Sequence, residues 1–567
     1  MGISSATSAA SPPPPPVSDL DHLPFVNRFT TQLPGDTEHT NELRQVHGAL
    51  YSEVAPTPVS APVTLAFSPE VADLLGIDLA TCASDDFAAV FSGNRVPAGG
   101  EPFAATYGGH QFGNWAGQLG DGRAIALGEV LDVNDQHQTL QLKGAGPTPY
   151  SRGADGRAVL RSSVREFLCS EAMFHLGIPT TRALSLVSTG DPIMRDMLYD
   201  GNQRPEPGAV VCRVAPSFIR FGTFELPASR GDIDLLTQLV EFTIRNDFPE
   251  LYDPEVPVEQ LVDRWFREVC DRTAALVVDW MRVGFVHGVL NTDNMSILGL
   301  TIDYGPYGWL EDFNLDWTPN TTDAMEARYR YGMQPQVAQW NLLQLANALV
   351  QVTREPEPFQ ESLERYRGQF QTQFDTMMSA RLGWGAARSG DAELVRELWK
   401  LLPRTEIDQV IFYRELAKVP VGRTGGAAGA EAGSSSASDN AITDDELLAP
   451  LAEAFYAPDE VAGELRDDLC TWLRTWGARV MAGAGGLADD SERRAQMDAR
   501  NPRYVLRNYL AQEAIDLAED GDAGLINELL EVLRHPYDDQ PGRERFAARR
   551  PEWARHRVGC SQLSCSS

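Results

Sequence analysis

Lysine is nearly absent from this chain, and the first lysine stands where a phosphate contact would be useful. Of 48 Lys and Arg residues only three are lysines, namely Lys143, Lys400 and Lys418. Lys143 ends the short strand-like run 140–143. Lys is a compact point charge, whereas Arg is a rigid planar fork. We therefore predict that Lys143 contacts a phosphate group from the end of a strand; a lysine retained there by chance is the alternative.

A glycine-rich segment precedes this lysine. Residues 113–123 hold four glycines within ten residues and are followed by a strand-like run, 124–130. Glycine lets the backbone approach a ligand, and successive N–H groups can surround phosphate oxygens. The segment matches neither common phosphate-loop pattern. Two interpretations therefore stay open: a nucleotide-binding loop, or a tight hairpin with Asp121-Gly122 as its turn.

The segment after Lys143 predicts a helix over 158–176. Its apolar residues recur at helical spacing, and Gly177 and Pro179 end it. Glu166 is the expected partner of Lys143, whereas for Glu171 a solvated helix face is the better interpretation. A glycine-rich hairpin, a strand lysine and a helix glutamate are the parts of a protein-kinase small lobe, where the Lys–Glu pair holds the lysine against the α- and β-phosphates.

A second set of polar residues points to metal and acid–base chemistry. His287 and Asn294 fall in register with the kinase catalytic loop H-R-D-x-x-x-x-N, and Asp303 begins a DFG-like triplet suited to Mg²⁺. The position of the kinase base is Val289, which cannot accept a proton. Asp293 is the only nearby carboxylate that could replace it, unless it serves as a helix cap or Asx turn.

Two arginines follow a strand-like run in the middle of the chain. Arg213 and Arg220 could bind phosphate oxygens with both guanidinium nitrogens. In a chain so rich in arginine, surface salt bridges are the alternative, and the spacing alone does not decide between the two.

With these residues in view, the chain resembles the selenoprotein O family (SelO, also called YdiU). The resemblance covers about residues 40–567. The segments that carry it are Tyr107-Gly108-Gly109-His110-Gln111-Phe112-Gly113, residues 117–124, residues 142–152, residues 287–296, residues 302–306, residues 501–508 and the terminal Cys565-Ser566-Ser567.

The resemblance implies a fold and an activity. The family has a kinase-like fold that binds ATP inverted relative to kinases and transfers AMP to Ser, Thr or Tyr hydroxyls of proteins, releasing pyrophosphate. It implies that Asp293 is the general base and that Asn294 and Asp303 hold Mg²⁺, with Mn²⁺ as the alternative. The residues implied in nucleotide binding are Gly120, Gly122, Arg123, Lys143, Asp155, Gly156, Arg213 and Arg220. A γ-phosphate-transferring kinase, which Val289 disfavours, and a non-catalytic nucleotide-binding pseudokinase are the alternative functions.

The expected fold class is α+β, a protein-kinase-like two-lobed fold with a β-rich small lobe, a helical large lobe and a further C-terminal helical region. A chain of 567 residues exceeds a usual single domain. The predicted divisions are a mostly disordered tail and lead-in (1–40), a small lobe (41–228), a large lobe (229–421), a flexible low-complexity insertion (422–440) and a helical extension with a cysteine-containing tail (441–567).

Charge and hydropathy limit the kinds of partner that this chain can bind. A net charge of −32 argues against nucleic-acid binding, and no apolar run is long enough for a membrane helix. The N-terminus lacks the basic and apolar parts of a signal peptide, so we expect a cytoplasmic protein. We also expect a monomer, and the resemblance implies protein substrates. Cys560 and Cys565 are expected to carry accessible thiols. Some family members carry selenocysteine where Cys565 stands, which implies a redox role for the tail. In some bacterial members a cysteine in the loop after residues 303–305 can pair with this region, but the comparable loop here, 316–320, has no cysteine. A Cys560–Cys565 disulfide stays open.

Overall fold

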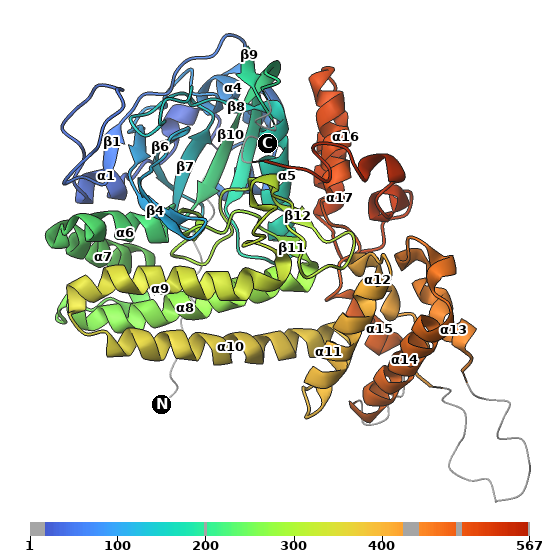
Figure 1. Cartoon of the computed structure of the whole chain (residues 1–567). Coiled ribbons are helices and arrows are strands. Elements are labelled where there is room, and N and C mark those ends of the chain that lie inside the picture. Colours follow the sequence, from blue (N-terminus) through green and yellow to red (C-terminus); the bar gives the residue numbers. More distant parts are fainter. Residues whose placement is uncertain (1–16, 198–200, 423–441, 484–489, 565–567) are drawn as a thin grey trace, which may run out of the picture.

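The computed structural model describes residues 17–197, 201–422, 442–483 and 490–564 (Figure 1). Residues 1–16 of the predicted tail, the predicted insertion from residue 423 on, and Cys565 lie outside the described residues. Antiparallel strands occupy the first part of the described chain and helices most of the rest. The prediction of an α+β protein is therefore confirmed.

Within the described residues, the main sheet has eight strands in the order β1-β3-β6-β7-β10-β9-β2, with β8 paired to β10. The strands of this sheet pair antiparallel with their neighbours. The strands are β1 (Tyr51–Glu53), β2 (Val63–Phe67), β3 (Phe103–Ala105), β6 (Ala124–Leu131), β7 (His137–Lys143), β8 (Ala158–Val159), β9 (Arg182–Arg195) and β10 (Arg204–Ala215). Short pairs form apart from it: β4 (Gly108–Gln111) with β5 (Asn114–Gln118), and β11 (Phe285–Val286) with β12 (Gly308–Trp309).

The centre of the sheet is buried on both faces. Alternate side chains of a strand point to opposite faces. In β6, Ile125 and Leu127 join the core made with α4, whereas Ala126 faces the core made with α5. The helices near the sheet are α1 (Arg28–Gln32), α2 (Pro69–Leu74), α3 (Leu79–Cys82), α4 (Asp85–Phe91) and α5 (Leu160–His175).

The two longest helices of the described residues, α8 (Val258–Val283) and α10 (Glu357–Arg381), run side by side beneath the sheet (Figure 1). This layer also contains α6 (Phe221–Arg230), α7 (Ile233–Asp247) and α9 (Gln334–Thr353). A separate apolar cluster joins the helices that follow, which are α11 (Asp391–Leu401), α12 (Gln409–Leu416), α13 (Asp444–Leu448), α14 (Gly463–Gly483) and α15 (Asp490–Asp498). The last two helices, α16 (Asn508–Glu519) and α17 (Gly524–Leu533), pack on α5.

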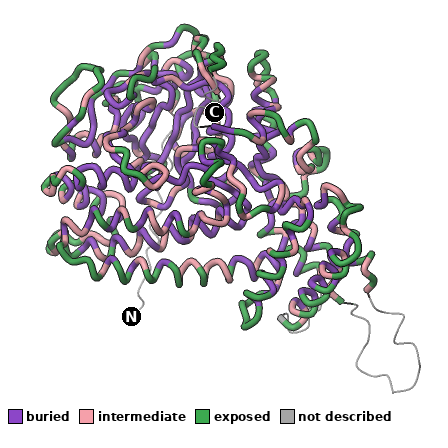
Figure 2. The backbone as a smooth tube through the Cα atoms, in the orientation of Figure 1, coloured by how far each residue is buried: buried purple, intermediate pink, exposed green. Residues whose placement is uncertain are grey.

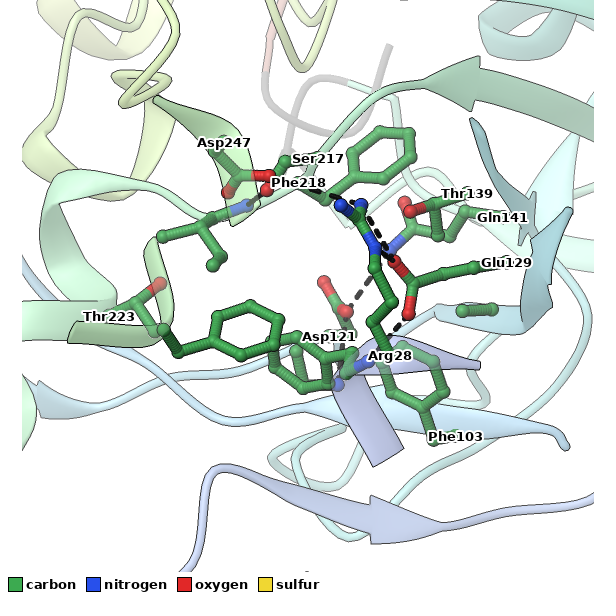
Figure 3. Close-up of a pocket in the computed structure, with 15 residues that line it drawn as sticks. Arg28, Phe103, Asp121, Glu129, Thr139, Gln141, Ser217, Phe218, Thr223 and Asp247 are labelled. Carbon is green, nitrogen blue, oxygen red and sulfur yellow. Dashed lines mark hydrogen bonds and ion pairs between the residues drawn. The ribbon is translucent and has the colours of Figure 1, made fainter. Parts of the chain in front are cut away.

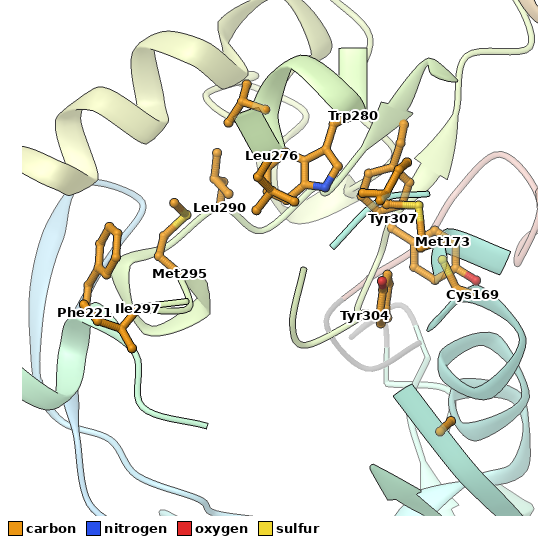
Figure 4. Packing of buried hydrophobic residues seen from close by; sticks show 14 of the residues in the cluster. Cys169, Met173, Phe221, Leu276, Trp280, Leu290, Met295, Ile297, Tyr304 and Tyr307 are labelled. Atoms are coloured by element: carbon orange, nitrogen blue, oxygen red, sulfur yellow. The ribbon is translucent and has the colours of Figure 1, made fainter. Parts of the chain in front are cut away.

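Helix α5 lies at the centre of the molecule, and nearly all of its residues are buried (Figure 2). Cys169 and Met173 on α5 belong to the same apolar cluster as Tyr304, Tyr307 and the α8 residue Trp280 (Figure 4). This cluster fixes the segment after Asp303 between the sheet and the helical layer. The Tyr307 hydroxyl also donates to the Arg165 carbonyl on α5 at 2.8 Å. Packing of this kind holds two distant segments of sequence in one geometry.

Several local predictions can be compared with these elements. The strand ending at Lys143 is β7, and the helix predicted over 158–176 is α5. In the described part of the lead-in, from residue 17 on, Leu20 and Phe29 are buried against the sheet. The predicted boundary at 228–229 falls inside α6. Among the described residues, no helix is both long enough and apolar enough to cross a membrane.

Candidate active site

A strand and a helix bring Lys143 and Glu166 together. Lys143 is the last residue of β7, and its Nζ forms an ion pair with the Glu166 carboxylate on α5. Both side chains are buried. Burial lowers the pKa of the Lys143 amine, and the Glu166 carboxylate opposes this effect. The Lys–Glu pair that the sequence predicts is thus present in the geometry of the site.

Arg213 joins this pair from the neighbouring strand. In the antiparallel pairing of β10 with β7, Arg213 stands opposite Gln141. Gln141 and Lys143 are two residues apart on one strand and therefore share a face of the sheet. The Arg213 guanidinium reaches Glu166 at 3.2 Å and donates to the Gln141 side-chain oxygen. The register of two strands therefore builds the basic side of the site.

Asp303 is the point on which the basic residues converge. Its two carboxylate oxygens each lie 2.5 Å from a guanidinium nitrogen, one of Arg213 and one of Arg220. Lys143 Nζ lies 3.9 Å away. Burial alone would raise the pKa of Asp303, but Arg220, Arg213 and Lys143 outweigh it and hold this pKa well below its usual range. Its backbone φ of +57° is uncommon for a residue with a side chain.

The loop before Asp303 is mostly buried. His287 Nε2 contacts the Ile302 carbonyl at 2.9 Å, and burial lowers the pKa of this imidazole. Residues Thr292–Asn294 form a single 3-10 turn, η3. Within it, Asn294 Nδ2 donates to the Val289 carbonyl at 2.8 Å. The Asn294 amide is thereby oriented with its nitrogen on the loop, and the residue lines the same cleft as Asp303.

Asp293 has different surroundings from Asp303. It lines the same cleft but is only 8% exposed. One carboxylate oxygen, Oδ2, accepts a hydrogen bond from Gln111 Nε2 at 3.1 Å, and Oδ1 is buried with no hydrogen-bond partner among the described residues. Burial raises the pKa of Asp293 to about 6, although the Gln111 hydrogen bond and the Arg220 charge act in the opposite direction. A carboxyl group with such a pKa can take up a proton near neutral pH.

The glycine-rich loop closes the cleft from the sheet side. Gly120, Gly122 and Arg123 lie between β5 and β6 and line the cleft. A Cβ on Gly122 would lie 2.8 Å from the Tyr150 carbonyl oxygen, so this position has no room for a side chain. The alternative of a hairpin turning at Asp121-Gly122 is wrong, because the hairpin here is β4–β5 and it turns at residues 112–113.

The second wall of the cleft comes from residues 150–157. Asp155 and Gly156 line it, and Gly156 has φ +67° with no space for a Cβ against the Gly146 backbone. Asp155 forms a two-point ion pair with Arg195, with both distances at 2.7 Å. The whole cleft has a volume of about 930 Å³, which is sufficient for a nucleotide. Its lining includes the glycine-rich loop, Lys143 and Arg213, and the two aspartates Asp293 and Asp303.

Comparison with known proteins identifies the family of this chain. The family model for "Protein adenylyltransferase SelO" matches residues 35–534. The chain is 58% identical over 550 residues to "Protein nucleotidyltransferase YdiU" of Rhodopirellula baltica, covering 96% of this chain and 99% of that protein. The chain belongs to the SelO family. It is also 57% identical to the protein of the same name from Aromatoleum aromaticum, covering 97% and 100% of the two chains.

Membership of the SelO family confirms the expected enzyme class, protein nucleotidyltransferase. The structure brings all twelve predicted site residues into or beside one cleft. Ten of them line it, and Arg220 and Glu166 reach it through the contacts of Asp303 and Lys143. The alternative that Arg213 and Arg220 form surface salt bridges is wrong, because each is only 2% exposed.

A SelO metal site would need oxygen ligands here. Asp303 supplies a carboxylate that stays ionised, and Asn294 supplies an amide whose nitrogen already donates elsewhere, so its oxygen is available. Such a pair suits Mg²⁺, which is usually held by one or two side chains together with phosphate oxygens and water. Among the described residues no group of three or more His, Cys, Asp or Glu could hold a metal by itself. The donor set therefore fits a metal that arrives with a nucleotide.

Sequence reasoning missed four residues around the SelO site. Gln141 and Asp121 form a buried hydrogen bond of 3.1 Å beneath Arg213, beside a cavity of about 30 Å³ (Figure 3). Gln111 and Gly109 contact Asp293. Only Gln141 had a usable signal, since it precedes Lys143 by two residues on one strand.

Two further expectations are corrected. Glu171 is not on a solvated face: it is fully buried, and its carboxylate accepts from Arg182 and from Ser68 at 2.7 Å. Cys560 is not accessible, because it is 3% exposed and burial raises the pKa of its thiol to about 12. Its carbonyl accepts from Asn508 Nδ2 at 2.9 Å. The six described cysteines are all free thiols.

Proposed function

We propose that this protein transfers AMP from ATP to hydroxyl groups of Ser, Thr or Tyr residues in protein substrates, and that the reaction depends on Mg²⁺. We also propose that the sheet-bearing part and the helical layer correspond to the small and large lobes of a kinase-like fold, with the divisions predicted from the sequence. Because the reaction consumes ATP, the cytoplasm is the proposed location, and a monomer suffices because one chain supplies every proposed site residue.

One observation supports AMP transfer over kinase chemistry most directly. Val289 occupies the position of the kinase base, and the buried carboxyl of Asp293 lies in the cleft with its pKa raised to about 6 by burial. Asp293 can therefore accept the proton of a substrate hydroxyl. The hydroxyl oxygen then forms a bond to the α-phosphorus of ATP, the bond from that phosphorus to the α,β-bridging oxygen breaks, and pyrophosphate leaves.

The basic side of the cleft supports an inverted nucleotide. Lys143, Arg213 and Arg220 converge at the sheet end, where they can bind the charge of the terminal phosphates and of departing pyrophosphate. Gly120, Gly122 and Gly156 allow the backbone to lie close to the ligand. Asp155 and Arg123 contribute polar groups to the same walls. When bound through Asn294 and Asp303, Mg²⁺ would neutralise phosphate charge beside Asp293.

Label transfer from ATP tests the proposal. Wild-type protein is incubated with a mixture of protein substrates and ATP labelled on either the α- or the γ-phosphate, with and without Mg²⁺. The expected result is stable protein labelling from the α-position alone, which disappears without the metal and in the Asp303→Ala variant. Asp85→Ala, a change at an exposed aspartate on α4, is the matched control and should label normally.

Each alternative has its own outcome. Labelling from the γ-position alone would establish a kinase and contradict AMP transfer. Binding of ATP with no transfer from either position would identify a pseudokinase. Hydrolysis of the labelled proteins to amino acids then identifies whether Ser, Thr or Tyr carries the AMP.

A further inference from the structure

The segment Tyr107–Gly113 has no role in the function proposed so far. It forms strand β4 and the turn into β5, and this hairpin is not part of the main sheet. The hairpin lies against α6 and against η3, the turn that carries Asp293 (Figure 1). The hairpin is therefore held by α6 and by the turn that carries Asp293, and not by the main sheet.

The hairpin is hydrogen-bonded to the Asp293 loop at consecutive residues. The His110 N–H donates to Thr292 Oγ1 at 2.7 Å, and Gln111 Nε2 donates to Asp293 Oδ2 at 3.1 Å. The Phe112 N–H donates to the Asn291 side-chain oxygen at 3.2 Å. Three neighbouring residues of the hairpin thus bind three neighbouring residues of the loop.

Gly109 makes the closest approach. A Cβ built on Gly109 would lie 2.8 Å from Asp293 Oδ1 and 2.9 Å from Asp293 Cβ. Real Cβ atoms do not come this close, so the hairpin backbone itself covers one side of the Asp293 side chain. Gln111 holds the other carboxylate oxygen. Together, the two residues restrict the carboxylate to one orientation.

The hairpin is fixed from its other side as well. His110 Nδ1 lies 2.5 Å from the Glu225 carboxylate on α6, and the His110 ring packs on Trp115 and Trp340. The Tyr329 hydroxyl contacts Asn291 Oδ1 at 2.5 Å and also accepts from the Phe112 N–H at 2.8 Å. An element held on both sides can transmit its position to the residue it covers.

We propose that the β4–β5 hairpin orients Asp293 for proton transfer, with Gln111 as a positioning residue and Gly109 as the contact that leaves the carboxylate one orientation. This inference rests on the proposed function, since it concerns the same site. It predicts that changes at Gln111 and Gly109 slow the chemical step while leaving ATP binding intact, because these two residues contact Asp293. The segment meets the proposed nucleotide-binding residue Arg220 through Tyr107, which neither change alters.

Two substitutions test this, each with a matched control. Gln111→Leu removes the hydrogen bond at similar size, and Gly109→Ala adds the methyl group that the site cannot hold. Both should lower kcat for α-label transfer by about 10- to 100-fold, the usual effect of losing a hydrogen bond to a charged group or displacing a reactive one, with the KM for ATP within twofold of wild type. The controls are Gln136→Leu on an exposed turn and Gly368→Ala on α10, where nothing lies within 4 Å; both should retain normal kcat.

A double-mutant cycle separates positioning from a general structural effect. In the Asp293→Ala background, measured over long incubations, Gln111→Leu and Gly109→Ala should cause less than a twofold further loss, because the residue they act on is gone. Three results would each overturn the inference. The first is that Gln111→Leu and Gly109→Ala lower kcat as much in the Asp293→Ala background as in the wild type. The others are a normal kcat in the single variants, or a raised KM for ATP with unchanged kcat.

Failure of the proposed function would look different. If the wild type transfers no label from the α-position, the proposed function fails, and the hairpin is then judged by the same cycle on the unfolding temperature, which needs no reaction. Coupling of Gln111→Leu with Asp293→Ala there would support a hairpin that holds Asp293, and strictly additive shifts would overturn it.

Discussion

Asp303 and Asp293 line one cleft, but Asp293 is buried, the Asp303 side chain is 21% exposed, and their polar neighbours differ. Asp303 has a guanidinium group on each carboxylate oxygen and an ammonium group 3.9 Å away. Asp293 has one amide donor, and its other oxygen is buried without a partner among the described residues. The pKa of Asp303 is held well below its usual range, while burial raises that of Asp293 to about 6. The difference teaches that cationic neighbours keep an aspartate ionised in this cleft against the effect of burial, whereas burial prevails for the aspartate that lacks them.

The largest expected effect is on Asp303. Replacing it by Asn leaves the buried Arg220 without an ion-pair partner among the described residues, whereas Arg213 keeps Glu166. Unpaired buried charges of this kind cost about 3–5 kcal/mol. Asp303→Asn should therefore lower the free energy of unfolding and abolish AMP transfer. Chemical denaturation and α-label transfer measure the two effects, and a variant as stable as wild type would show that the arginines do not depend on Asp303.

Asp293→Asn should reduce AMP transfer without reducing stability. An amide cannot accept the substrate proton, so AMP transfer is expected to fall by about 10²- to 10⁴-fold. Because burial already disfavours the charged carboxylate, the neutral amide should leave the unfolding temperature unchanged or raise it. Thermal unfolding beside label transfer checks both parts. A marked loss of stability would mean that the Asp293 charge is needed for folding.

Gln141→Leu should have a smaller effect and a different kinetic signature. Gln141 accepts a hydrogen bond from Arg213 and donates one to Asp121 at 3.1 Å. Without it Arg213 loses a fixed partner, and we expect the KM for ATP to rise by about 5- to 20-fold with kcat less affected. Steady-state kinetics in ATP test this. A pure fall in kcat would place Gln141 with Asp293 and not with the nucleotide-binding side.

The smallest expected effect is that of Asp247→Asn on the unfolding temperature, at a buried aspartate outside the proposed active site. Asp247 lines the cavity behind the sheet, near Arg28 and Ser217 (Figure 3), and burial raises its pKa from 3.8 to about 7. Between these values the folded protein binds more protons than the unfolded chain, so the Asp247 contribution to stability falls as pH rises from about 4 to 7. Asp247→Asn removes this slope. Its unfolding temperature relative to wild type should rise by roughly 2–4 °C between pH 4 and pH 8, with AMP transfer unchanged.

Unfolding scans across this pH range give the answer for Asp247. A difference between variant and wild type that does not change with pH would show that Asp247 is ionised at all these values, as Asp303 is, and the comparison between charge neighbours and burial would then need revision.

The parts of the site that sequence could predict are those set by short-range spacing. The strand before Lys143, the helix carrying Glu166 and the spacing of His287, Asn294 and Asp303 all follow local patterns, and the structure has them at the expected positions. The prediction that these residues converge on one cleft rests on the resemblance to the SelO family. No local pattern fixes the distance between a strand and a loop far along the chain.

The parts that could not be predicted depend on which distant element covers a residue. Glu171 stands among polar neighbours on its helix, yet it is buried by its pairing with Arg182 on β9. Gln111 contacts Asp293 because a separate hairpin packs on η3. The lead-in at 17–40 is packed because Phe29 stacks on Phe103 of β3. In each case the cause is a long-range contact that composition and periodicity do not report.

The most direct test of the central claim compares ATP binding to Asp303→Asn and Asp293→Asn, measured by calorimetry with Mg²⁺ present. If Asp303 organises the basic residues and the metal while Asp293 handles only the proton, Asp303→Asn should bind ATP more than about tenfold more weakly than wild type, and Asp293→Asn should bind within about threefold of it. Equal losses of affinity in the two variants would contradict the division of roles between the two aspartates.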